Sequence, residues 1–290
     1  KRTLNNLIEL KKGLETCIPK KEMDTNILIA SWNIKELGHL NKRLPETYMY
    51  MAETISAFDI VSIQEIKSSL FDMNLIMRIL GKHYKYLITD ITDGSQGNKE
   101  RFGCIYDTRR VSHSGLSGEL VVSPENSDPT LLSQLKRTPA ITGFESGWKK
   151  FSLINVHLHP GNKTKDKAIR HKEVSYLIQQ LQEKLRRKHL WCENLILLGD
   201  TNLYENNTET IDLIKNAGFN ECESLLGQPT TTSLNQIYDR IFFKVNRYFK
   251  LRKNKLKKEN DRIEAMNKKI AEDNEKPYQD FTDGHMYGGN

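Results

Sequence analysis

Cysteine is scarce in this sequence. The 290 residues include four cysteines, far apart and without a CxxC pair, namely Cys17, Cys104, Cys192 and Cys222. Because zinc knuckles need closely spaced cysteines and disulfide-stapled folds need many, this distribution argues against both classes. We expect ordinary buried thiols instead.

Long hydrophobic runs are also missing. No window approaches the roughly 18 apolar residues of a membrane-spanning helix, and the opening KRTLNNLIELKKG is too polar for the core of a secretory signal. We therefore expect no membrane partner and favour a cytoplasmic location. The compartment stays open, because the chain starts at Lys1 rather than Met and removal of an upstream segment is compatible with the sequence.

What is present is enough apolar material for a core, together with an excess of positive charge. Hydrophobic residues make up 37% of the chain, which suffices for one large domain or two small ones. The formal net charge is +7. This excess favours a polyanionic partner, nucleic acid or an anionic membrane surface, although many enzymes are equally basic.

Short apolar strands dominate the middle of the chain. A leading helix is expected over 4 to 15 and an amphipathic helix over 165 to 187. The predicted strands are apolar runs next to polar residues: 27 to 33, 59 to 65, 102 to 107, 140 to 144, 151 to 159, 194 to 200 and 238 to 243. Strands separated by helices and by hairpin-length loops indicate an α/β layered fold with mixed sheets.

The last fifth of the sequence differs from the rest. Residues 244 to 258 hold eight Lys or Arg in fifteen positions, with apolar residues interleaved. A solvated helix is the favoured interpretation, and a basic arm that grips phosphates is the alternative. We divide the chain into a leading helix (1 to 25), a central domain (26 to 243) and a charged helical extension with a glycine-rich tail (244 to 290).

The predicted strand 194 to 200 ends on Gly199 and Asp200, and Thr201 and Asn202 follow, which is an unusual end for a buried strand. Alone, this GDTN sequence is as typical of a turn as of a site. Other apolar strands end or begin on polar residues as well: Asn33, Gln64, Glu65, His157, His159, Tyr238 and Asp239. Because unpaired buried carboxylates are costly, a shared rim that holds a metal ion explains the pattern better than coincidence.

The chemistry of this rim indicates phosphate-ester hydrolysis. Carboxylates and amides without cysteine select Mg²⁺, with Mn²⁺ or Ca²⁺ as alternatives, over zinc. His157 adds a group that titrates near neutral pH. A metal that polarises a phosphoryl oxygen, a carboxylate that positions water and an acid for the leaving group are the parts that such a reaction needs.

These motifs resemble the endonuclease/exonuclease/phosphatase superfamily, the group typified by deoxyribonuclease I. The shared stretches, in the same order, are WN at 32 and 33, IVSIQE to Glu65, ERFGCIYD from Glu100, RTP at 137 to 139, LINVHLH around His157, LLGDTN around Asp200 and YDRI around Asp239. The resemblance covers residues 26 to 243, the catalytic domain, and is closer to the deoxyribonuclease branch than to the abasic-site or phosphoinositide branches. It implies a four-layer sandwich, two packed mixed β-sheets flanked by helices.

The resemblance also implies roles for individual residues. Glu65 is expected to hold the metal with Asn33 close by, Asp200 to orient or deprotonate the attacking water, and Asn202 to bond the scissile phosphate. The remaining implied active-site residues are the catalytic His157, Glu100 behind it, and Asp239 as a second acidic position.

Four further residues are candidate substrate contacts. Lys67 follows the QE motif, Arg137 lies in RTP, and Thr230 and Thr232 precede YDRI; for each, a surface residue without a role is the alternative. His159 and His171 are interpreted as surface or structural histidines. Arg170 and Glu173 are interpreted as an exposed or rim ion pair.

The resemblance fails at the end of the chain, where the superfamily has a Ser-Asp-His triplet and an apolar strand. Here the charged insertion follows YDRI, and TDGHMYGGN then offers Asp283 and His285 with one glycine between them. An added residue places His285 on the opposite face of a strand unless a bulge absorbs it. Replacement of the triplet by this pair is one alternative; a truncated chain, an expression remnant or a disordered tail are the others.

We therefore expect a divalent-metal-dependent phosphodiesterase, foremost an Mg²⁺-dependent DNA endonuclease that uses in-line attack of water. The expected partner is a nucleic acid, DNA rather than RNA, with no obligate protein partner. The alternatives are a phosphoinositide or sphingomyelin phosphoesterase of the same superfamily and an inactive module that binds nucleic acid or protein. The lipid enzyme predicts an exposed apolar loop at the site rim, which the sequence does not reveal.

Overall fold

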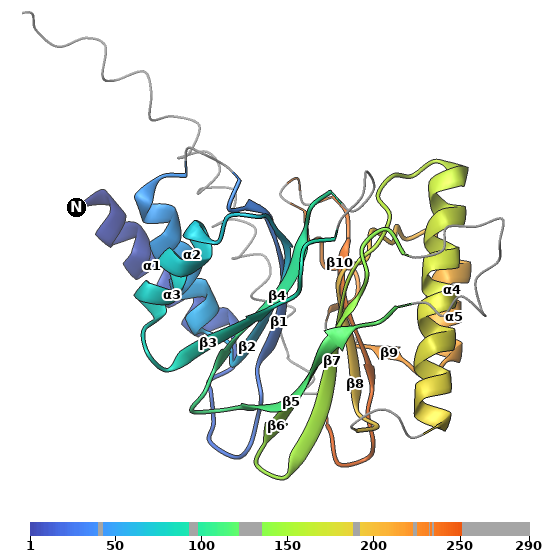
Figure 1. Cartoon of the computed structure of the whole chain (residues 1–290). Helices are drawn as coiled ribbons and strands as arrows, with labels where there is room; N and C mark the ends of the chain where they lie inside the picture. The colour runs from blue at the N-terminus through green and yellow to red at the C-terminus, as the bar shows by residue number, and fades with distance from the viewer. Residues whose placement is uncertain are drawn as a thin grey trace, which may run out of the picture.

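A computed structural model describes residues 1–39, 43–92, 98–121, 135–187, 192–222, 225–231, 233 and 235–250. Two β-sheets pack face to face, and helices cover the outer face of each (Figure 1). This four-layer arrangement confirms the predicted α/β sandwich with two mixed sheets. No helix among the described residues is long and apolar enough to cross a membrane.

The smaller sheet has the strand order β1-β2-β4-β3. Its strands are β1 (Ile29–Leu37), β2 (Ile60–Ile66), β3 (Tyr84–Ile88) and β4 (Arg101–Asp107). β1 and β2 run parallel, whereas β4 pairs antiparallel with both β2 and β3. The helices on this side are α1 (Arg2–Cys17), α2 (Pro45–Ser56) and α3 (Phe71–Leu80).

The larger sheet has the order β5-β6-β7-β8-β10-β9. Its strands are β5 (Ser112–Glu119), β6 (Ala140–Ser146), β7 (Lys149–His157), β8 (Leu195–Asp200), β9 (Asn220–Glu221) and β10 (Asp239–Lys244). Among the described pairings of this larger sheet, only β7 with β8 is parallel. The helices α4 (Thr164–Arg186) and α5 (Thr208–Asn216) cover its outer face (Figure 1).

Apolar side chains from both sheets fill the space between them. This core joins Ile60 of the smaller sheet to Phe144, Phe151 and Leu198 of the larger one. A polar link crosses the same space, because Gln64 Nε2 donates to Asn155 Oδ1 at 2.6 Å. The core therefore fixes the two sheets at one separation, and residues at their shared edge face one another.

All seven predicted strands and both predicted helices are present, with shifted ends. The leading helix α1 buries no side chain and packs against α2. Among the four cysteines, Cys104 is buried and the other three are partly buried. The charged extension predicted from 244 begins with the last residue of β10, and its residues from 251 onward lie outside the described residues.

Candidate active site

A row of three side chains crosses three neighbouring strands of the larger sheet. His157 lies opposite Asp200 in the parallel pairing of β7 and β8, and Asp200 lies opposite Asp239 in the antiparallel pairing of β8 and β10. Residues at matching positions of adjacent strands point to the same face, so the three side chains project together. His157 Nε2 lies 3.7 Å from Asp200 Oδ2.

Gly199 allows β8 to come close to β7 at this point. It has a φ of +139°, and a Cβ atom built on it would lie 2.0 Å from the carbonyl oxygen of Val156. No side chain fits there without moving the backbone of β7. The glycine of the GDTN sequence therefore sets the position of Asp200 beside His157.

The smaller sheet supplies Asn33 and Glu65. Asn33 Nδ2 donates to Glu65 Oε1 at 2.8 Å and to Asp200 Oδ2 at 2.9 Å, which links the two sheets. Glu65 has a φ of +60° and lies where the pairing of β2 with β4 is interrupted, between Ile63 and Ile66. A positive φ is unusual for a residue with a side chain, and such irregularities concentrate at functional sites.

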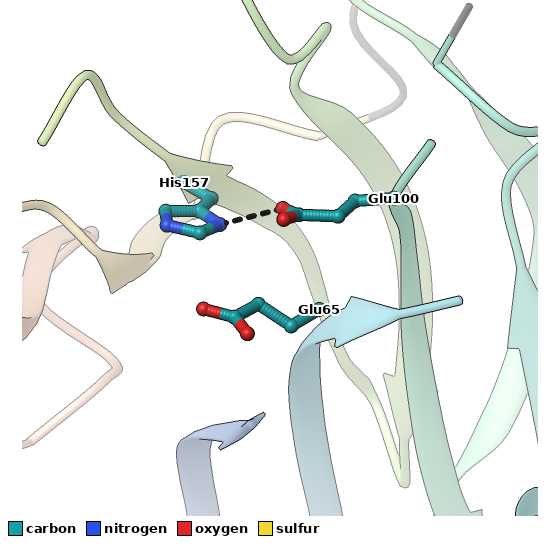
Figure 2. Close-up of side chains that lie close together, drawn as sticks. All are labelled: Glu65, Glu100 and His157. Atoms are coloured by element: carbon teal, nitrogen blue, oxygen red, sulfur yellow. Dashed lines mark hydrogen bonds and ion pairs between the residues drawn. The ribbon is translucent and has the colours of Figure 1, made fainter. Parts of the chain in front are cut away.

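Glu100 lies at the centre of a buried group of hydrogen-bond donors, and Figure 2 shows it beside His157 with Glu65 nearby. Glu100 Oε2 accepts bonds from Arg137 Nε at 2.7 Å and from His157 Nδ1 at 3.0 Å. Glu100 Oε1 accepts bonds from Lys67 Nζ at 3.2 Å and from Asn98 Nδ2 at 2.6 Å. A proton held on His157 Nδ1 by this carboxylate leaves Nε2 as the ring atom on the side of Asp200.

The two acidic residues Glu100 and Asp239 have opposite pKa shifts. Burial opposes ionisation of Glu100, but His157, Arg137 and Lys67 outweigh it and lower the pKa of Glu100 to about 2. Burial, followed by the neighbouring Asp200 carboxylate, raises the pKa of Asp239 to about 7. Glu100 is therefore an anion throughout the neutral range, whereas Asp239 titrates within it.

Glu65, Glu100 and His157 have ligand atoms within 4.8 Å of one another. Glu100, however, is already paired with cations and is a poor candidate for holding another one. Asn33 Oδ1 and Asp239 Oδ1 are buried oxygens without a protein partner, and the Asn33 backbone bonds Asp239. Together with Glu65 they are a hard oxygen donor set that fits Mg²⁺ or Mn²⁺.

The other residues of the predicted site hold the surrounding loops. The Asn202 backbone N–H donates to Asp200 Oδ1 at 3.1 Å, and Asn202 Nδ2 donates to the carbonyl of Leu158 at 3.1 Å. Thr230 Oγ1 accepts the backbone N–H of Asp239 at 3.0 Å. All three contacts are at the edge where His157, Asp200 and Asp239 lie, but the predicted phosphate contacts of Asn202 and Thr230 remain predictions.

Lys67 and Arg137 are buried, which removes the alternative that they are ordinary surface residues. Lys67 Nζ bonds Glu100 and the carbonyl of Asn98. Arg137 Nε also bonds Glu100, whereas its Nη1 atom is buried without a protein partner. Thr232, Asp283 and His285 lie outside the described residues, and their predicted roles remain predictions.

The interpretation of Arg170 and Glu173 as an exposed or rim ion pair is wrong. Both side chains are buried, and Arg170 is fully buried. Arg170 Nη1 donates to the carbonyls of His159 at 2.8 Å and Gly161 at 2.6 Å. Glu173 Oε2 accepts the backbone N–H of His159 at 2.8 Å. The two side chains therefore anchor the loop that follows His157.

The two further histidines have structural contacts, in agreement with their predicted interpretation. His159 is buried with its Nε2 atom 3.1 Å from Asp166 Oδ1, and His171 Nδ1 lies 3.0 Å from Thr210 Oγ1. The sequence analysis missed two amides of the site, Asn98 and Asn155. Asn155 carried a usable signal, since an amide in the middle of the apolar run FSLINVHLH needs buried partners.

No family model matches the chain. Among curated proteins, human deoxyribonuclease-1 is 24% identical over 187 residues, which is 61% of this chain and 61% of that enzyme. The aligned part therefore spans less than two thirds of the relative's length.

Solved structures share the fold over most of the chain. An endonuclease/exonuclease/phosphatase family protein from Bacteroides thetaiotaomicron is 18% identical with a TM-score of 0.55, over 75% of this chain and 83% of that one. TDP2 from D. rerio, complexed with single-strand DNA product, is 19% identical with a TM-score of 0.53, over 79% and 87%.

A mannosyl-6-phosphatase from Bacteroides thetaiotaomicron is 17% identical with a TM-score of 0.54, over 75% of this chain and 85% of that one. At identities of 17 to 19%, the similarity to these three solved structures shows a shared fold and nothing about activity. They agree with the motif order along the sequence and with the four layers of the structure. The chain thus has the deoxyribonuclease I-like fold of the endonuclease/exonuclease/phosphatase superfamily.

Proposed function

We propose that this protein is a divalent-metal-dependent phosphodiesterase that hydrolyses DNA. The observation that carries the proposal is the convergence of acidic, amide and imidazole groups from both sheets on one edge. Asn33 bonds Glu65 of its own sheet and Asp200 of the other, while His157, Asp200 and Asp239 lie in one row. These groups come from strands far apart in the sequence, so a local turn does not explain them.

A divalent ion held by Glu65, with Asn33 and Asp239, would supply charge neutralisation at a phosphoryl oxygen. Asp200 is suited to orient a water for in-line attack and to take its proton, because Asn33 and the backbone of Asn202 fix its two oxygens. His157 Nε2 is suited to donate a proton to the leaving oxygen, since the Glu100 carboxylate holds Nδ1 and fixes the orientation of the ring.

Arg137 is the best-supported substrate contact among the predicted ones. Its Nε atom is held by Glu100, and its Nη1 atom is a buried donor without a protein partner next to the site. Such an orphan donor is costly unless a ligand occupies it, and guanidinium groups bind phosphate well. We assign it to a non-bridging oxygen of the scissile phosphate, with Asn202 as the second donor.

Nucleic acid, and DNA in particular, is supported by charge and by relatives. The net charge of +7 matches a polyanion better than a small phosphoester. One curated relative is a deoxyribonuclease, and one structure with the same fold holds a single-strand DNA product.

Cleavage of supercoiled plasmid, linear DNA and RNA tests the proposal. We expect cleavage of plasmid with Mg²⁺ or Mn²⁺, none with chelator, and a loss of about 10³-fold or more in Asp200→Ala. Asp212→Asn, which removes an exposed carboxylate of α5, is the matched control and should keep full activity. Cleavage that ignores chelator or survives Asp200→Ala would refute the mechanism.

A second candidate is a phosphoesterase for amphiphilic substrates, and one observation favours it. A groove of about 850 Å³ runs beside α2 and α3, lined by Tyr48, Leu75 and Ile79 together with Arg43, Arg78 and an exposed Phe71. It borders the site, because Gly38 of the groove lies two residues after Glu36, whose N–H donates to Glu65 Oε2 at 3.1 Å. Turnover of a phospholipid or inositol phosphate, with no nucleic acid cleaved, would select this function.

A further inference from the structure

Exposed aromatic side chains gather at the end of the larger sheet opposite the candidate active site. Trp148, in the turn between β6 and β7, is 71% exposed, and Tyr248, after β10, is 52% exposed. Their rings meet edge to face with centroids 5.8 Å apart. Neighbouring exposed rings of this size are typical of contact surfaces.

The distance from the candidate active site follows from the strand itself. β7 runs from Lys149 to His157, about 26 Å at roughly 3.3 Å per residue. In Figure 1 the β6–β7 hairpin lies at the lower edge, whereas α4, which follows the His157 end of β7, begins at the upper edge. The aromatic cluster is therefore outside the catalytic edge.

Positive charges accompany the rings. Lys149 Nζ lies 5.7 Å from the centroid of the Trp148 ring, and Arg247 Cζ lies 5.0 Å from that of Tyr248. The segments 146–150 and 245–250 hold four Lys or Arg and no Asp or Glu. We call Trp148, Lys149, Arg247 and Tyr248 the basic aromatic patch.

The fold holds this patch in place. Phe249 packs on Phe151 of the inter-sheet core, with ring centroids 6.1 Å apart. The Asn246 backbone N–H donates to Asn194 Oδ1 at 2.9 Å, and Asn246 Oδ1 accepts the N–H of Tyr248 at 3.1 Å. A ligand that stacks on these rings loses little affinity to ordering of the protein.

We propose that the basic aromatic patch is a second nucleic-acid surface, which binds single-stranded nucleic acid away from the candidate active site. Bases would stack on Trp148 and Tyr248 while phosphates pair with Lys149 and Arg247. Rings interleaved with cations suit this ligand, because every base has a face that stacks and every nucleotide carries a phosphate. The patch lacks the run of aliphatic side chains that a membrane anchor needs.

Binding of a fluorescein-labelled oligothymidylate to the full chain tests this proposal. Anisotropy is measured with chelator present, so the result does not depend on catalysis and can succeed where the proposed function fails. We expect Trp148→Ala with Tyr248→Ala to weaken binding by about 30-fold or more, because the stacking of two bases is lost. Trp148→Phe keeps a ring and should retain most of the affinity. Lys149→Ala with Arg247→Ala removes two phosphate contacts and should reduce the slope of log affinity against log salt by about 1.4.

Two controls separate this outcome from unfolding and from other ligands. Leu4→Ala removes an exposed apolar side chain of α1, at another surface, and should leave binding unchanged, and turnover of bis-p-nitrophenyl phosphate should be equal in all patch variants. Unchanged oligothymidylate binding by the double aromatic variant would overturn the proposal. So would an effect of that variant on binding to phosphatidylserine vesicles alone, because it would assign the patch to a membrane surface.

Discussion

At the scale of single residues, the candidate active site depends on a glycine as much as on its carboxylates. Gly199 has a φ of +139°, and the backbone of β7 comes so close to it that an added Cβ atom would lie 2.0 Å from the Val156 carbonyl oxygen. Because its neighbour Asp200 faces His157, a change at Gly199 alters the site as well as the sheet.

We expect Gly199→Ala to destabilise the protein by about 2–4 kcal/mol, since the added methyl would meet a backbone oxygen at a strained φ. Urea unfolding measures the change. Gly118→Ala in β5 is the matched control, because a Cβ atom there meets no heavy atom within 4 Å, and it should stay within about 0.5 kcal/mol of the parent. Equal effects at the two positions would contradict the close approach.

Glu100 offers a second test at this scale, through pH. Glu100→Gln leaves the buried cations Lys67 and Arg137 without their anion, and we expect a loss of about 3–5 kcal/mol at neutral pH. The pKa of Glu100 is lowered to about 2, so its contribution is complete above the ordinary glutamate pKa and is lost as pH falls through 2.

The difference in the free energy of unfolding between the parent and Glu100→Gln should therefore be constant from about pH 5 to 7. It should become smaller below about pH 4. Unfolding by urea across this range measures it. Glu145→Gln removes a surface partner of Lys150 and should cost less than about 1 kcal/mol at every pH. A difference for Glu100→Gln that widens toward acid would show that the carboxylate is not held ionised.

At the scale of elements, α4 connects the site to the outer layer of the larger sheet. Arg170 projects from this helix into the protein, where it donates to the carbonyls of His159 and Gly161 and to Asn207 Oδ1 at 3.2 Å. The loop after His157 and the loop after Asn202 thus share one guanidinium group.

We expect Arg170→Met to cost about 3 kcal/mol of folding stability, because two buried acceptors and one half-buried acceptor lose their donor. Phosphodiesterase activity should fall as well, since the loop positions His157 and Asn202. Arg187→Ala removes the exposed partner of Glu183 near the end of α4 and should cost within about 0.5 kcal/mol. Thermal unfolding measures the stability of each variant, and the rate of bis-p-nitrophenyl phosphate hydrolysis measures its activity. If Arg170→Met changed neither quantity, the two loops would not depend on Arg170 for their conformation.

The strand β5 and the helices α2 and α3 were not located from the sequence, because their sequence patterns are weak. β5 is an edge strand with the sequence SHSGLSGE, whose side chains are mostly exposed, so no apolar alternation marks it. α3 starts at Phe71 without a side-chain cap, which removes the usual start signal, and the start signal of α2 is Pro45, a residue that is also common in loops. By contrast, β7 and β8 are nearly all buried, and their apolar runs were sufficient.

The residues that converge at the candidate site stand out in the sequence more clearly than the residues that support them. His157, Asp200 and Asp239 end or begin apolar strands, where a polar residue stands out in the sequence. Asn98 and the burial of Arg170 depend on which loops meet in space, and sequence spacing does not report that. Polar contacts between distant segments depend on the three-dimensional fold, so the sequence alone could not predict them.

At the scale of the whole molecule, the proposed metal site uses both sheets. Glu65 and Asn33 come from the smaller sheet and Asp239 from the larger one, and Asn33 already bridges to Asp200. Since the unfolded chain does not bring these groups together, an ion bound there stabilises the folded state alone. Metal binding at this site should therefore stabilise the packing of the two sheets against each other.

We expect Mg²⁺ to raise the free energy of unfolding by about 2.7 kcal/mol at 100 times its dissociation constant, because an ion that binds only the folded state stabilises it by mass action. Thermal unfolding with Mg²⁺ and with chelator measures the shift, which for a chain of this size amounts to several degrees. Glu65→Gln should lose the shift, whereas Asp212→Asn should keep it. A shift that survives Glu65→Gln would place the ion elsewhere, and since the measurement needs no substrate, it separates metal binding from catalysis.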